Sequence, residues 1–76
     1  MSMTYMISEL RRRERILMDR AREHIRVSER KDASAFERKI AEVRAERLSA
    51  EASGLAWART LIEDEMEKGE KSNAEG

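Results

Sequence analysis

The sequence predicts an all-α protein, an antiparallel hairpin of two long helices that dimerises into a four-helix bundle. Three observations predict it. The chain of 76 residues has no proline, and Gly54 alone interrupts the helix-forming composition between Thr4 and Lys68. Apolar residues recur with the helical period, and no segment alternates as a strand would. The second half of the chain carries two apolar faces, of which a single partner helix can cover only one.

The first helix is expected over about residues 4–30. Its apolar residues fall within one stripe at about 100° per residue. Arg30 and Lys31 suit the end of this helix, because cations interact favourably with a helix C-terminus. The stripe consists of Met3, Ile7, Leu10, Leu17, Met18, Ala21 and Ile25.

A turn at 31–33 and a second helix over about 34–68 follow from capping signals. Ser34 and Glu37 have the spacing of a capping box, in which each side chain bonds the backbone amide of the other residue. Gly69 is the expected C-cap, which leaves 69–76 as a disordered polar tail. Residues 1–68 then form a single helical-hairpin domain.

The two apolar faces of the second helix lie about 90–120° apart around the helix. The first face consists of Phe36, Ile40, Val43, Ala50, Gly54, Ala58 and Leu61, with Trp57 at its edge. The second face consists of Ala41, Leu48, Ala52, Leu55, Ile62 and Met66.

Folding back at 31–33 places residues whose numbers sum to about 64 opposite each other. Leu10 then meets Gly54 and Met3 meets Leu61, so that the first face packs on the first helix. In the same register Glu14 is predicted to form an ion pair with Arg47, which would fix the register more than it would add stability.

The second face is left for another molecule, because a two-helix hairpin of this size buries too little surface to offset chain entropy. Self-association into a homodimeric four-helix bundle is the simplest solution. The alternative fold is a three-helix bundle in which Ser53 and Gly54 break the second helix and 55–68 folds back.

Composition excludes several classes of function. Sixteen basic and sixteen acidic residues give a formal net charge of zero, so no overall field attracts nucleic acid or an anionic membrane. No cysteine and a single histidine, His24, exclude disulfides, thiolate zinc sites and a cysteine nucleophile. No signal-like or membrane-spanning apolar run is present, so we expect a cytoplasmic protein without membrane contact. We expect no metal, cofactor or small-molecule substrate.

The candidate surface for protein binding or dimerisation lies on the second helix. It comprises Leu48, Ala52, Leu55, Ile62 and Met66, joined by Trp57 and Tyr5. Tyr5 and Trp57 are expected to converge with Met6 near the open end of the hairpin, where adaptable and aromatic side chains suit a binding patch.

An arginine ridge on the first helix is the candidate nucleic-acid surface. It comprises Arg11, Arg15, Arg22, Arg26 and Arg30. Such a ridge could contact phosphates, but Asp19, Glu23 and Glu29 interrupt it and no aromatic residue is interleaved for base stacking. A solvated, ion-paired face is the favoured interpretation.

Two further features are given ordinary interpretations. His24 is expected to be a half-buried packing residue, since no nucleophile or orienting carboxylate accompanies it. The run of Glu63, Asp64, Glu65 and Glu67 lacks the spacing of a calcium loop and is interpreted as a solvated acidic end.

We therefore expect a protein without enzymatic activity, because no phosphate-binding loop, paired catalytic carboxylates or nucleophile arrangement is present. The leading hypothesis is a homodimer that binds another protein, as an adaptor or as an inhibitor of a larger regulator. A nucleic-acid-binding dimer that uses the arginine ridge is the first alternative, and a structural coiled-coil assembly element is the second. The architecture is similar to that of many small regulators encoded by phages, plasmids and mobile elements, an analogy of architecture alone.

Overall fold

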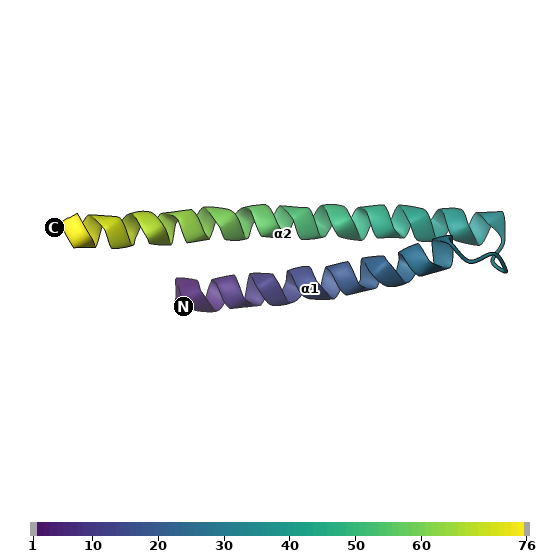
Figure 1. Cartoon of the computed structure of the whole chain (residues 1–76), viewed down its shortest axis with the longest axis horizontal. Helices are drawn as coiled ribbons and strands as arrows, with labels where there is room; N and C mark the ends of the chain where they lie inside the picture. The colour runs from purple at the N-terminus through teal and green to yellow at the C-terminus, as the bar shows by residue number, and fades with distance from the viewer. Residues whose placement is uncertain (1, 76) are drawn as a thin grey trace.

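The computed structural model is a helical hairpin, as the sequence predicts. Helix α1 (Met3–Ser28) and helix α2 (Ala35–Glu75) lie side by side and antiparallel, joined by the loop 29–34 (Figure 1). The structure describes the backbone of residues 2–75 and the side chains of residues 2–69. The molecule is a rod of 63 × 15 × 15 Å, and α2 runs along almost its full length.

Both helices begin at serine caps. The Ser2 hydroxyl accepts a hydrogen bond from the Tyr5 amide at 3.1 Å, so α1 starts slightly earlier than predicted. The Ser34 hydroxyl accepts one from the Glu37 amide, also at 3.1 Å, which confirms the predicted start of α2. Helix α1 ends at Ser28 rather than at the predicted residue 30. The Ser28 hydroxyl donates a hydrogen bond to the Ile25 carbonyl at 2.6 Å.

The second helix is continuous, so the three-helix alternative with a break at Gly54 is wrong. Gly54 keeps helical backbone geometry, and its cost of about 1 kcal/mol relative to alanine is too small to end a helix surrounded by good helix formers. Gly69 also lies inside α2 and is not a C-cap. Helix α2 continues past Gly69 to Glu75 instead of ending at residue 68 as predicted, and the side chains beyond Gly69 lie outside the described residues.

The contact between the helices is a seam of two heptad rows. In α1 the row follows positions 7, 10, 14, 17, 21, 24 and 28, and each of these residues is buried or half-buried. In α2 the matching inner row consists of Ala41, Ala45, Leu48, Ala52, Leu55, Arg59, Ile62 and Met66. Four alanines, Ala21, Ala41, Ala45 and Ala52, are its fully packed members, and no large side chain among the described residues is completely buried.

A second heptad row on α2 faces away from α1. This outer row consists of Phe36, Ile40, Val43, Arg47, Ala50, Gly54, Trp57 and Leu61, and every member except the half-buried Ile40 is exposed. The sequence led us to expect these residues against the first helix, and that expectation is wrong. The second face packs on α1 instead. It carries the long aliphatic side chains of Leu48, Leu55 and Ile62, and it lies beside Arg59, which pairs with Glu14.

The predicted register of the two helices is also wrong. Leu17 lines a groove with Gly54 and Leu55, and Leu10 lines one with Ala58 and Ile62, so paired numbers sum to about 70 instead of 64. The loop 29–34 allows the first turns of α2 to extend beyond the end of α1 (Figure 1).

We predict that Gly54→Ala raises the free energy of unfolding by about 0.5–1 kcal/mol. A Cβ on Gly54 would meet no neighbouring side chain within 4 Å, so the helix gains propensity without a clash. Urea denaturation followed by far-UV circular dichroism measures the change. The reciprocal variant Ala50→Gly, at an exposed position of the same helix, should lose a similar amount, and equal stability of the two variants would contradict the prediction.

Candidate functional site

An ion-pair cluster crosses the seam towards the open end of the hairpin. The Arg59 guanidinium donates two hydrogen bonds to the Glu14 carboxylate, from Nε at 2.7 Å and from Nη2 at 3.2 Å. Arg59 also donates to Glu63 at 3.1 Å, and Arg11 of α1 donates to the same Glu63 oxygen at 3.0 Å. Two charges from each helix are therefore joined in one network.

The Glu14–Arg59 pair occupies the inner positions of this cluster. Only 17% of the Glu14 side chain and 23% of the Arg59 side chain is exposed. The predicted Glu14–Arg47 pair is wrong, because Arg47 belongs to the exposed outer row. The prediction correctly expected an ion pair at Glu14 but chose the basic residue of the wrong face.

The cluster favours the charged forms of Glu63 and Arg59. Hydrogen bonds from Arg59, with its charge and that of Arg11 in support, lower the pKa of the Glu63 carboxyl against the opposing effect of burial. Hydrogen bonds to Glu14 and then Glu63 raise the pKa of Arg59 further above its ordinary value.

The outer row of α2 is the candidate functional surface. Phe36 is 75% exposed and Trp57 is 69% exposed, while Val43 and Leu61 are 42% and 46% exposed. These four side chains share one face because they are spaced by multiples of a heptad or half-heptad. Aromatic and aliphatic side chains in an exposed line indicate a contact surface rather than a solvated helix face.

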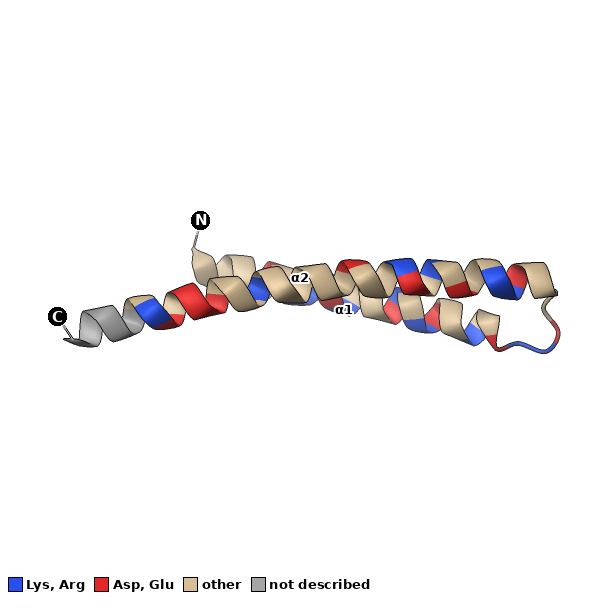
Figure 2. Ribbon diagram, turned by 90° about the horizontal axis from the view of Figure 1, so that it is seen from above, with Lys and Arg blue, Asp and Glu red and all other residues tan. Residues whose placement is uncertain are grey.

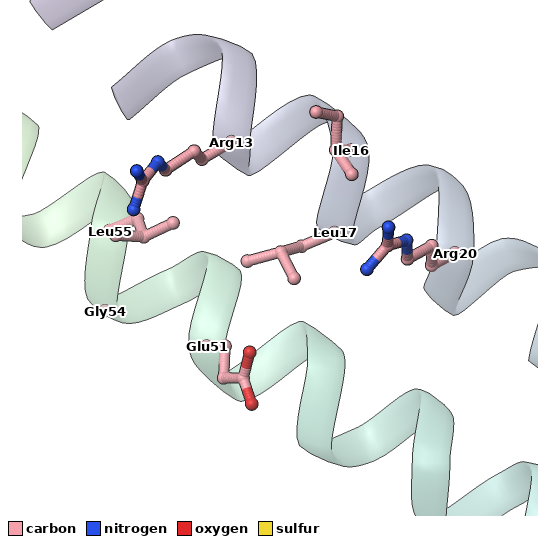
Figure 3. Close-up of a pocket in the computed structure, with 7 residues that line it drawn as sticks. All are labelled: Arg13, Ile16, Leu17, Arg20, Glu51, Gly54 and Leu55. Atoms are coloured by element: carbon pink, nitrogen blue, oxygen red, sulfur yellow. The ribbon is translucent and has the colours of Figure 1, made fainter. Parts of the chain in front are cut away.

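A shallow groove follows the boundary between α1 and α2 beside the outer row. Its central part, of about 580 Å³, is lined by Arg13, Ile16, Leu17 and Arg20 from α1 and by Glu51, Gly54 and Leu55 from α2. Figure 3 shows the Leu17 side chain pointing between the two helices, with Arg13 and Arg20 on either side of it. The groove is open along its length and mostly apolar, which suits an elongated partner better than an enclosed small molecule.

The structure divides the predicted protein-binding residues into two groups. Ala52 is buried, and Leu48, Leu55, Ile62 and Met66 are half-buried in the inner row. Trp57 and Tyr5 are exposed.

The expected convergence at the open end is found in part. Tyr5 and Met6 line a groove with Ala58 and Ile62, but Trp57 is not among the residues that line it. Phe36, Val43 and Leu61 form an exposed surface that was not predicted from the sequence. Their heptad spacing with Trp57 is the pattern that could have indicated it.

The predicted arginine ridge is partly neutralised by ion pairs. Arg11 bonds Glu63, and Arg22 bonds Asp19 at 3.4 Å. Arg15 and Arg26 are exposed on α1, whereas Arg30 lies in the loop and not on the helix. The charges of both signs alternate along the two helices (Figure 2), as expected of an ion-paired surface.

The remaining candidates occupy ordinary positions. His24 is half-buried and lines a groove with Val27, Phe36 and Ile40. Within the described part of the chain, no group of three or more histidine or acidic side chains is placed to hold a metal ion. Neither helix, as far as it is described, has a stretch long and apolar enough to cross a membrane.

Comparison of the chain with protein-family models, curated proteins and solved structures gives no match.

We predict that loss of either inner charge destabilises the hairpin more than loss of an exposed pair. Glu14→Ala or Arg59→Ala leaves the other charge partly desolvated and unpaired in the seam. Lys39→Ala, which removes an exposed pair of 3.5 Å to Glu42, is the matched control and should change little. Thermal unfolding followed by circular dichroism gives the ranking.

The double variant Glu14→Leu/Arg59→Leu completes this test. It should recover or exceed the wild-type melting temperature, because apolar residues of similar volume can replace an ion pair at a seam without desolvation cost. If the two single variants were as stable as Lys39→Ala, the pair would not be constraining the seam.

We predict that acid weakens the hairpin through Glu63. Its pKa is lower in the folded state, so its stabilising contribution is complete above the ordinary glutamate pKa of about 4.3 and is lost as the pH falls through the folded value. Glu63→Gln should therefore melt below wild type at pH 7, and the difference should be smaller at pH 3. Asp64→Asn, an exposed neighbour, is the control, and a constant difference between Glu63→Gln and wild type at both pH values would contradict the prediction.

Proposed function

We propose that this chain is a non-enzymatic protein-binding module, an adaptor or an inhibitor of a larger regulator, that offers the outer row of α2 to a helix of its partner. The observation that carries the proposal is the exposure of Phe36, Val43, Trp57 and Leu61 along one face of a continuous helix. This role corresponds to the small regulators of phages and mobile elements that the architecture resembles.

The spacing of the outer row favours a helical partner. Its members recur at intervals of three and four residues over about seven helical turns, from Phe36 to Leu61. A second helix laid along this face would bury the row continuously, as in helix-in-groove recognition. Trp57 and Phe36 stand near the two ends of the row and supply the large aromatic anchors that dominate many interfaces.

The nucleic-acid alternative has one favourable observation. Arg15 and Arg26 are exposed and form no ion pair within the described residues. Two of the other arginines of the ridge, Arg11 and Arg22, are engaged by acidic side chains. The apolar outer row has no role in phosphate binding, so protein binding accounts for more of the surface.

We predict that Leu61→Glu abolishes capture of the partner while the hairpin remains folded. The exposed leucine is a member of the outer row, and a carboxylate there would be buried without a partner in the complex. Immobilised wild type and variant are compared in a native extract of the source cells, with bound proteins quantified by mass spectrometry. Circular dichroism verifies that the helix content of the bait is unchanged.

Two matched variants complete the experiment. Ser8→Glu introduces the same charge at an exposed position of α1 and should retain capture. Arg26→Ala should also retain it. Equal capture by Leu61→Glu and wild type would contradict the proposal, and loss of capture in Arg26→Ala alone would favour the nucleic-acid alternative.

A further inference from the structure

We infer that the helix that fits the outer row is α2 of a second copy of this chain, in antiparallel orientation, with residues whose numbers sum to 97 opposite each other. The inference rests on the proposed function, since both use the outer row. It goes further by naming the occupant, the orientation and the register. It also assigns the dimer contact to the face opposite the one that sequence reasoning selected.

The single hairpin leaves an unusually large surface exposed. Its accessible surface is 6202 Å² for a chain of 8.9 kDa. Compact monomers of this mass have about 4,800 Å² by the usual scaling with mass. The excess exceeds the roughly 800 Å² that each partner contributes to an interface of standard size. The seam contains no completely buried large side chain among the described residues, so additional apolar burial has to come from another molecule.

One antiparallel register pairs every member of the outer row. With numbers summing to 97, Phe36 packs against Leu61 of the partner subunit and Ile40 against Trp57 of the partner subunit. Val43 then packs against Gly54 of the partner subunit, so that a branched side chain lies opposite a residue without one. A shift by seven residues in either direction leaves members of the row without a partner.

The charges beside the outer row favour this orientation. Antiparallel coiled coils bring the flanking residues of the same side together. In this register Arg44 lies beside Glu51 of the partner subunit, and the two-fold axis forms the same pair a second time. The other flanking positions match Glu46 with Ser53 and Lys39 with Thr60, so no like charges meet.

The parallel orientation is disfavoured by the same residues. It would bring Lys39 beside Arg44 of the partner subunit and Glu46 beside Glu51 of the partner subunit, two repulsive contacts on each side of the dimer. It would also place the two Arg47 side chains against each other at the centre of the interface. Two copies of the outer row are therefore complementary only in the antiparallel orientation.

The resulting assembly is a row of helices in the order α1, α2, α2, α1. The inner and outer rows lie roughly 140° apart around α2, taking 100° per residue. That angle keeps the two α1 helices apart, so the dimer is an open layer of four helices and not a closed bundle. The α1–α2 grooves remain accessible on one side of the layer.

Disulfide trapping tests the inference, because the chain contains no cysteine of its own. Phe36→Cys and Leu61→Cys chains, one of them carrying a mass tag, are mixed and oxidised. The antiparallel register brings position 36 of one chain opposite position 61 of the other, so we expect a crosslinked heterodimer from the mixture and little crosslinked product from either variant alone. Efficient crosslinking of Phe36→Cys with itself would establish the parallel orientation and overturn the inference.

The mass of the native protein gives an independent readout. Light scattering at 100 µM or so should give twice the chain mass for wild type and for Ser8→Glu, and the single mass for Val43→Glu with unchanged helix content. A monomeric wild type would overturn the inference. A monomeric wild type whose Leu61→Glu variant loses partner capture would leave the proposed function intact. If outer-row variants changed neither partner capture nor mass, both proposals would be wrong.

Discussion

The register of the hairpin is fixed by one ion pair in a seam whose most buried side chains are alanines. Alanine side chains contribute little apolar area and have no rotamers to lock, so they allow the helices to approach without deciding which residues meet. The bidentate contact between Arg59 and Glu14 makes that decision, because sliding α1 along this face of α2 would separate the two half-buried charges. The leucines and isoleucine of the inner row then supply apolar contact around a register that is already fixed.

The helices and the serine caps could be predicted from the sequence because they are local properties. Ser34 and Glu37 specify the start of α2 within four residues, and continuity through Gly54 follows from the small cost of one glycine. The choice between two apolar faces is not local. From the sequence alone, Glu14 could pair with Arg47 or with Arg59. The packing of the whole seam distinguishes the two pairs, because Leu48 and Leu55 lie on the same face of α2 as Arg59.

The reversal of the two faces changes which residues are available for function. The larger aliphatic side chains of the second face are used to hold α1, and the exposed face is the one that carries Phe36 and Trp57. A face with aromatic anchors near both ends can form an interface with few residues, since such anchors carry most of the binding energy. If the proposed partner and the inferred second copy use the same surface, they exclude each other, and which of them is bound depends on their concentrations.

The outer row also bears on the problem of register slippage. A heptad pattern repeats after seven residues, so two helices that present only leucines could slide by one repeat and lose little. Arg47 breaks this translational degeneracy. The register that sums to 97 sets Arg47 opposite the small Ala50 of the partner subunit, whereas a slip that sums to 90 would set it opposite the bulkier Val43 of the partner subunit. The same slip would leave Trp57 and Leu61 opposite the loop 29–34, without a partner in the outer row. The position of the arginine and the finite length of the row thus carry its positional information.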